Sequence, residues 1–150
     1  MKPITFTCED TLSLTPDEIV GLIMDPSNWC KFRGYGPIPG IKSAEFEVKT
    51  PAVVGSRVRV TETNGSTHVE EFVEWQPGRR LQQVFSDFSP PLSRLATGME
   101  ETWEFSRTGD STRVLRSFKL HPKSALSRPI LWLISLLLKR AIARNLREMR

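Results

Sequence analysis

Residues 41–121 form a nearly unbroken series of short segments with alternating apolar and polar residues, and this feature constrains the fold more than any other. Alternation at every second position is typical of strands that bury one face. Turn sequences rich in Gly, Pro, Asn and Asp separate the segments, so consecutive strands are expected to pair as an antiparallel meander. The predicted strands are IKSAEFEV (41–48), SRVRVTET (56–63), THVEEFVEW (67–75), LQQVFSDF (81–88), TGMEETWEFSR (97–107) and TRVLRSFKL (112–120).

The N-terminal residues predict one further strand and then a helix. ITFTCEDTLSL (4–14) alternates in the same way. The sequence TPDEIVGLIM follows, with Thr15 as the helix N-cap, Pro16 in the first turn and acidic residues close to the helix start. We expect this helix to end at DPSNW (25–29), because the Asp-Pro pair disfavours helical backbone.

A second short helix or turn is predicted next, and it carries Trp29 and Phe32. RGYGPIPGI (33–41) then contains too much Gly and Pro for regular structure and is expected to be a loop. Such a loop would form a natural mouth for a cavity.

Apolar residues from about Ala125 to the C-terminus recur at three- and four-residue spacing, which is typical of one face of a long helix. A single sheet must cover its apolar face, and this helix is long enough to cross it. The expected fold class is therefore α+β, with a curved antiparallel sheet of about seven strands around the C-terminal helix, in one domain of residues 1–150. The stripe consists of Leu131, Ile134, Leu138, Ile142, Leu146 and Met149.

Charge and cysteine content narrow the function classes. Residues 121–150 hold seven Lys or Arg and one Glu, whereas residues 1–120 hold 14 Lys or Arg and 16 Asp or Glu. No cationic face interleaved with aromatics is found, so nucleic acid is not an expected partner. Cys8 and Cys30 lack metal-binding spacing, and we expect no metal, no organic cofactor and a cytoplasmic location. The longest apolar run, 129–138, is too short to span a bilayer.

The last predicted hairpin places charged residues on an otherwise apolar face. Counting alternate positions back from the turn puts Glu101 on the face of Trp103 and Phe105, and Arg116 on the face of Val114. If Phe105 lies opposite Val114, Glu101 and Arg116 are diagonal neighbours within reach of a salt bridge. Two interpretations stay open. The pair closes the cavity floor or reaches water at its edge, or Arg116 orients a ligand carbonyl, carboxylate or phenolate while Glu101 accepts a hydrogen bond or transfers a proton.

An Asn-Gly pair at residues 64–65 predicts a two-residue turn in an earlier hairpin. With that turn, Glu71 faces inward together with the charged pair described above, and His68 faces outward. We expect His68 and His121 to be solvated residues rather than catalysts. The inward face predicted from this parity comprises Val58, Val60, Glu62, Val69, Glu71, Val73 and Trp75.

The order of these elements resembles the START-like or SRPBCC superfamily, also described as helix-grip or Bet v 1-like, and in particular its polyketide cyclase/dehydrase-like branch. The resemblance covers residues 4–150 and implies a cavity between the sheet and the C-terminal helix that takes an apolar or aromatic small molecule. It is carried by TPDEIVGLIMDPSNWCKF (15–32), GPIPGIKSAEF (36–46), VEWQPGRRL (73–81), ETWEFSRTGDSTRV (101–114) and the amphipathic C-terminal segment.

In such a fold, the inward apolar and aromatic side chains are the expected ligand contacts, because ligand cavities are lined mainly by such residues. The predicted set is Trp29, Phe32, Tyr35, Val60, Val73, Trp75, Phe85, Met99, Trp103, Phe105, Val114, Phe118, Ile134 and Leu138.

Three functions remain open from the sequence. The first is binding of a small hydrophobic or aromatic molecule, lipid or polyketide-like, without chemistry. The second is a cyclase- or dehydratase-like enzyme in which Glu101 or Glu71 acts as the base and Arg116 stabilises a developing enolate. The third is a module that contacts a membrane or a protein partner through its C-terminal helix.

The third function depends on apolar and cationic residues of the C-terminal helix that lie outside the apolar stripe described above. Trp132, Leu133, Leu136 and Leu137 add apolar surface to the first half of the helix, and the second half is cationic. Such a surface suits an anionic membrane, a protein partner or a dimer, and it leaves the oligomeric state open. The cations expected to make this contact are Lys139, Arg140, Arg144 and Arg147.

Overall fold

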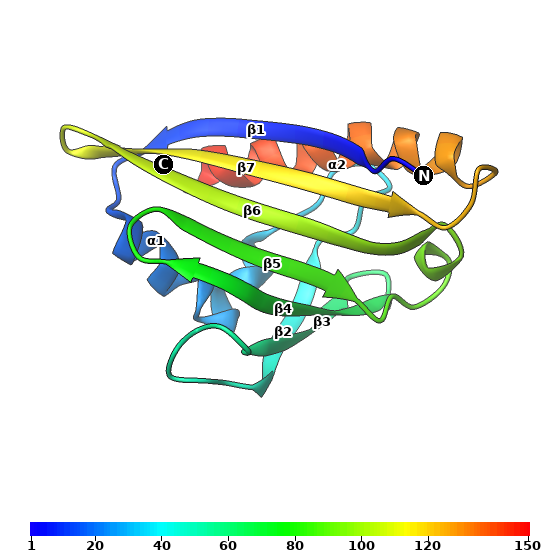
Figure 1. The fold of residues 1–150 in the computed structure, drawn as a ribbon, viewed down its shortest axis with the longest axis horizontal. Coiled ribbons are helices and arrows are strands. Elements are labelled where there is room, and N and C mark those ends of the chain that lie inside the picture. Colours follow the sequence, from blue (N-terminus) through cyan, green and yellow to red (C-terminus); the bar gives the residue numbers. More distant parts are fainter.

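The computed structural model describes residues 1–150 as one seven-stranded antiparallel sheet with helices packed against it (Figure 1). The strand order is β1-β7-β6-β5-β4-β3-β2, so every strand except β1 lies beside its sequence neighbour. The predicted α+β class, a curved antiparallel sheet around a long C-terminal helix, is confirmed. The elements are β1 (Ile4–Leu12), α1 (Pro16–Ile23), η1 (Pro26–Lys31), β2 (Ile41–Val48), β3 (Arg57–Glu62), β4 (Thr67–Gln76), β5 (Arg80–Ser86), η2 (Leu92–Arg94), β6 (Ala96–Thr108), β7 (Ser111–Pro122) and α2 (Arg128–Glu148).

The two short helices after β1 form as their sequence predicts. Thr15 caps α1, because its hydroxyl accepts from the backbone N–H of Glu18 at 3.1 Å while the Glu18 carboxylate accepts from the Thr15 N–H at 3.0 Å. The 3₁₀ helix η1 carries Trp29, whose indole N–H donates to the carbonyl of Ile23 at 2.7 Å. This bond fixes Trp29 against the end of α1.

Gly34 gives the loop after η1 its shape. Its φ is +73°, and a Cβ at this position would lie 2.1 Å from the carbonyl oxygen of Ile38, so only glycine fits. The chain turns back here, and Ile38 and Pro39 reach the cavity between the sheet and the helices.

The hairpin of β6 and β7 has the predicted register. Phe105 lies opposite Val114, Trp103 opposite Arg116, and Glu101 opposite Phe118. Because paired residues share a face, the charged pair lies on the face that packs toward α2.

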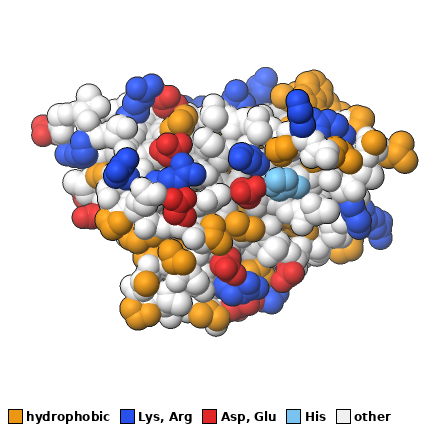
Figure 2. Space-filling view, viewed as in Figure 1, with side chains coloured by type: hydrophobic (Ala, Val, Ile, Leu, Met, Phe, Trp, Pro, Cys, Tyr) orange, Lys and Arg blue, Asp and Glu red, His pale blue; other side chains and the backbone are white.

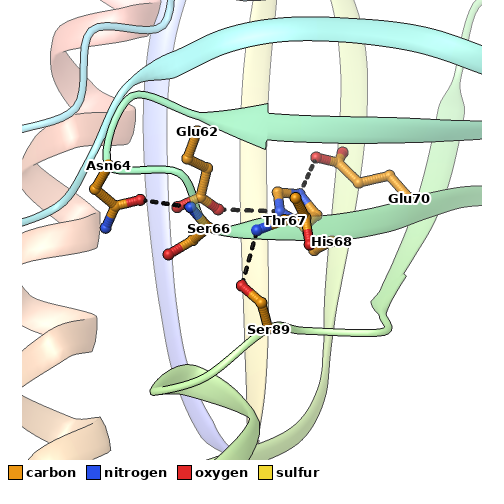
Figure 3. Close-up of polar contacts among 7 residues, drawn as sticks. All are labelled: Glu62, Asn64, Ser66, Thr67, His68, Glu70 and Ser89. Carbon is orange, nitrogen blue, oxygen red and sulfur yellow. Dashed lines mark hydrogen bonds and ion pairs between the residues drawn. The ribbon is translucent and has the colours of Figure 1, made fainter.

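The hairpin of β3 and β4 corrects the sequence prediction. The N–H of Glu62 donates to the carbonyl of Ser66 at 2.8 Å, so the loop holds three residues, and the predicted two-residue turn is wrong. The Asn64 side chain accepts from the N–H of Ser66 at 3.0 Å, and Gly65 has φ +88° (Figure 3). An odd loop reverses the parity of β4, so His68 and Glu70 lie on the inner face.

A bulge in β4 restores the original parity further along the strand. The register shifts between Phe72 and Glu74, leaving Val73 as the extra residue. Trp75 therefore lies opposite Leu81 and packs against the core, as predicted. The predicted inward position is wrong for Val69, Glu71 and Val73, which lie before or at the bulge.

The core fills the space between the sheet, α1 and α2. Its fully buried side chains include Phe72, Phe118, Leu12, Ile19, Leu131 and Leu146. The long helix α2 runs along β1 and β7, while η1 lies against β2 at the other edge of the sheet (Figure 1). No helix in the structure combines the length and apolar character required to cross a membrane.

Candidate functional site

A cavity of about 480 Å³ lies between the inner face of the sheet and the helices. Its size falls within the range of small-molecule sites in proteins. Seventeen of the 28 residues that line it are hydrophobic, so most of its wall suits an apolar molecule. The remaining wall is polar: its buried charged side chains lie on β4, β6 and β7, and the partly exposed Glu62 lies at the end of β3.

Part of the predicted contact set lines this cavity. Of the remaining predicted contacts, Val60, Phe105 and Val114 are buried in the core away from the cavity, and Trp75 packs against that core. Tyr35 and Val73 are 36% and 38% exposed, and neither lines the cavity. The residues that do line it are Trp29, Phe32, Phe85, Met99, Trp103, Phe118, Ile134 and Leu138.

Glu101 and Arg116 form a buried ion pair in the cavity wall. Nε of Arg116 donates to Oε2 of Glu101 at 2.5 Å, and the Arg116 and Glu101 side chains are 7% and 4% exposed, respectively. Nη1 of Arg116 donates to Oδ1 of Asn145 on α2 at 2.9 Å. The guanidinium carbon lies 4.0 Å from the ring centroid of Trp103, a cation–π contact. Burial raises the pKa of Glu101 above its ordinary value, while the charge and hydrogen bond of Arg116 act in the opposite direction.

His68 lies between two carboxylates on the same inner face (Figure 3). Its Nδ1 is 3.0 Å from Oε1 of Glu62, and its Nε2 is 2.8 Å from Oε2 of Glu70. The ring stacks on Phe85 with 5.4 Å between the centroids. Burial alone would lower the pKa of His68, but the hydrogen bonds and charges of Glu62 and Glu70 outweigh it and raise the pKa to about 9. The prediction of a solvated His68 is therefore wrong.

Hydrogen bonds, together with the cation–π contact between Trp103 and Arg116, connect these two groups into one polar band across the sheet. Gln83 donates to Oε1 of Glu70 at 2.9 Å, and its own oxygen accepts from Nε1 of Trp103 at 3.1 Å. Every fully buried polar side-chain atom has a hydrogen-bond partner. We use "polar band" for Glu62, His68, Glu70, Gln83, Trp103, Glu101, Arg116 and Asn145.

Glu71 lies outside the cavity, so its predicted place beside Glu101 and Arg116 is wrong. It points to the other face of the sheet, where its carboxylate accepts from Nη1 of Arg57 at 2.7 Å. The reason is the reversed parity of β4 described above. His121 also lies away from the cavity. It is partly exposed, and its Nε2 is 2.5 Å from Oε2 of Glu100.

Cys8 and Cys30 are both free thiols. Burial raises the pKa of Cys8, and its Sγ donates to the carbonyl of Lys139 at 3.4 Å, while Cys30 is exposed. No group of three or more His, Cys, Asp or Glu side chains is arranged to hold a metal ion.

The outward side of α2 carries large apolar residues in its first half. Trp132 and Leu133 are 52% and 55% exposed, and Ile130 and Leu136 are similarly open. Figure 2 shows hydrophobic side chains, with Lys and Arg beside them, gathered at the end of the molecule where α2 begins. Between Arg128 and Arg147 the helix has no acidic residue. We call Ile130, Trp132, Leu133 and Leu136 the outer apolar patch.

Comparison with known families gives one match over nearly the whole chain. The model of the family described as "Polyketide cyclase / dehydrase and lipid transport" matches residues 3–150. The comparison with curated proteins finds no match.

Solved structures with the same architecture share little sequence with this chain. The protein TTHA0849 from Thermus thermophilus is 17% identical with a TM-score of 0.72, and the alignment covers 97% of this chain and 94% of that one. A START superfamily protein from Mycobacterium smegmatis is 12% identical with a TM-score of 0.70, covering 95% and 93%. Ara h 8.0201 is 16% identical with a TM-score of 0.62, covering 94% and 95%. These likenesses show the fold alone.

Proposed function

Because the chain belongs to the polyketide cyclase/dehydrase and lipid transport family, we propose that it binds a small hydrophobic or aromatic molecule, lipid or polyketide-like, in the cavity beneath α2. The observation that carries the proposal is the cavity itself, which is mainly apolar and has one organised polar wall. An apolar body would gain free energy by leaving water, and the polar band would orient its polar group.

The proposal predicts that the purified protein retains a defined molecule, and that filling the cavity removes it. Leu138 lines the cavity from α2, so Leu138→Trp should lower the fraction of protein carrying the molecule at least tenfold. Leu133→Trp makes the same change on the exposed side of the helix and should leave that fraction unchanged. Native mass spectrometry, followed by denaturing extraction and mass identification, measures both.

A thermal melt of each variant confirms that it is folded. Protein that carries nothing, and that also fails to bind a panel of lipids and aromatic polyketide-like compounds, would contradict the proposal.

A cyclase- or dehydratase-like reaction is a second candidate, and the environment of Glu101 favours it. This carboxyl group is buried in a mainly apolar site, its pKa is raised by burial, and Arg116 beside it can donate to a developing enolate. In that case Glu101→Gln should abolish conversion of the bound compound even at concentrations that saturate the variant with it. Recovery of the compound chemically unchanged after incubation with the wild-type protein would favour binding alone.

The outer apolar patch supports an additional role at a membrane surface. Apolar side chains beside a cationic helix end match an anionic lipid surface, where the former insert and the latter meet headgroups. Lys139, Arg140, Arg144 and Arg147 supply the cations. Arg140 lies over the ring of Tyr35 and Arg144 is near Glu148, so their charges remain close to the helix surface.

Vesicle co-sedimentation tests this role. The protein should bind vesicles containing phosphatidylglycerol at least tenfold more tightly than pure phosphatidylcholine vesicles, and Leu133→Glu should remove most of that binding. Val54→Glu adds the same charge at a similarly exposed apolar residue in the loop before β3 and should have no effect. Equal behaviour of the two variants, or no binding to either vesicle, would count against a membrane role.

A further inference from the structure

The cations in the buried wall of the cavity are already committed to partners within the protein. Arg116 uses Nε for Glu101 and Nη1 for Asn145. His68 uses both ring nitrogens, one for Glu62 and one for Glu70. Neither residue therefore offers an unpaired positive charge to a ligand.

Carboxylate oxygens, by contrast, remain available. Oε2 of Glu62 and Oε1 of Glu101 make no hydrogen bond within the protein. Because no fully buried polar side-chain atom lacks a partner, both oxygens are open to the cavity or its mouth. The remaining guanidinium nitrogen of Arg116, Nη2, is open for the same reason and can donate to a neutral oxygen.

The balance of charge in this wall also disfavours a negatively charged ligand. Three carboxylates, from Glu62, Glu70 and Glu101, face two cations, from His68 and Arg116, within this wall. A ligand anion would lose its hydration and would also approach carboxylates that already occupy both cations. A hydroxyl or amine would instead donate to the open oxygens.

The cavity mouth does not change this balance. Lys31 lines the cavity but is exposed, so a pair with it would be screened by water and weak. Glu148 also lines the cavity, and its carboxylate pairs with Arg33 at 2.7 Å. The mouth therefore holds one weakly placed cation and one further carboxylate.

We propose that the ligand is an apolar or aromatic molecule that donates hydrogen bonds and carries no negative charge, bearing a hydroxyl or amine group rather than a carboxylate. This inference rests on the proposed binding function and narrows its ligand class. The proposed class includes hydroxylated aromatic compounds, sterol-like alcohols and long-chain amines. It excludes free fatty acids and aromatic acids.

Three probes that share one ring system test the inference at neutral pH by isothermal titration calorimetry. They are naphthol, naphthylmethylamine and naphthoic acid, substituted at the same ring position, so their apolar bodies are identical. The naphthol and the amine should bind at least tenfold more tightly than the acid. Tighter or equal binding of the acid would overturn the inference alone, whereas binding of none of the three would overturn the proposed function as well.

Substitutions in the polar band test whether it causes the preference for the naphthol and the amine over the acid. Glu101→Gln removes a carboxylate and releases Arg116, so the affinity for the acid should rise at least tenfold while that for the amine falls. Glu100→Gln changes the neighbouring residue of β6, whose carboxylate lies on the other face, and should leave all three affinities unchanged. Glu62→Gln, at the partly exposed end of the band, should lower amine affinity even if Glu101→Gln is poorly folded. An unchanged preference in folded Glu101→Gln and Glu62→Gln would refute this assignment.

Discussion

Replacing Arg116 with Met should lower the free energy of unfolding by about 3–5 kcal/mol, as is found when one partner of a buried ion pair is removed. The variant leaves Glu101 buried without its cation and also breaks the bond from Arg116 to Asn145 on α2. Uptake of a proton by Glu101 would relieve part of the cost, because burial already raises the pKa of that carboxyl group. Urea unfolding of wild type and variant measures the loss.

Two controls separate this effect from a general loss of charge. Arg113→Met removes an exposed arginine of the same strand that pairs with Glu9, and it should lower the free energy of unfolding far less than Arg116→Met does. Combining Arg116→Met with Glu101→Met replaces both charges by apolar side chains and should recover most of the stability. If the free energy of unfolding of the single variant Arg116→Met lay within about 1 kcal/mol of the wild-type value, it would contradict the expectation.

Stability should fall as the pH rises from 6.5 toward 9, and His68 should cause most of the change. The folded-state pKa of about 9 lies above the ordinary value of 6.5, so the folded protein holds this proton more tightly than the unfolded chain. The contribution is therefore complete below pH 6.5 and disappears as the pH passes through about 9. Its full size is roughly 3 kcal/mol.

Urea unfolding at a series of pH values tests this dependence. His68→Gln should remove most of the slope between neutral pH and pH 9, because its side chain does not titrate. His121→Gln changes the other histidine, which lies partly exposed outside the cavity, and should preserve the slope. A slope that persists unchanged in His68→Gln would show that other groups produce it.

The fold could be predicted because its information is local. Alternation marks each strand, Thr15 and Pro16 mark the start of α1, and spaced apolar residues mark α2. The register of β6 and β7 also followed from the sequence, because the turn between Thr108 and Ser111 is short and the apolar residues on both strands fit a single alignment.

Two residues of the polar band, His68 and Glu70, were missed because the length of the turn before β4 was predicted wrongly. The sequence Asn64-Gly65 fits both a two-residue turn and part of a three-residue loop, and a single residue of difference moves every side chain of β4 to the other face. Glu70 was therefore not predicted to face inward, and Glu71 was, wrongly. The sequence feature that fits the longer loop is Ser66, the residue directly after it, whose N–H donates to the Asn64 side chain.

Other site residues depend on helix packing or loop geometry, which the alternation of apolar and polar residues does not specify. Asn145 reaches Arg116 because α2 packs on β1 and β7 with the side that carries Asn145 turned toward Arg116. Ile38 and Pro39 reach the cavity because the loop turns back at Gly34. Neither placement follows from periodicity, since the first depends on how α2 packs against the sheet and the second on the backbone conformation of the loop.

The position of β1 at the edge beside β7 determines when this protein can fold during synthesis. The first strand pairs with the last, with Ile4 opposite Leu120, while β2 to β7 pair in chain order. A ribosome can therefore release the hairpins of the meander one by one, but β1 has no partner until β7 has emerged, and the inner face stays uncovered until α2 follows. Closing so long a loop is slow. The inner face of the strands that have already emerged would thus stay exposed until β7 and α2 follow, and their emergence completes the sheet and covers that face.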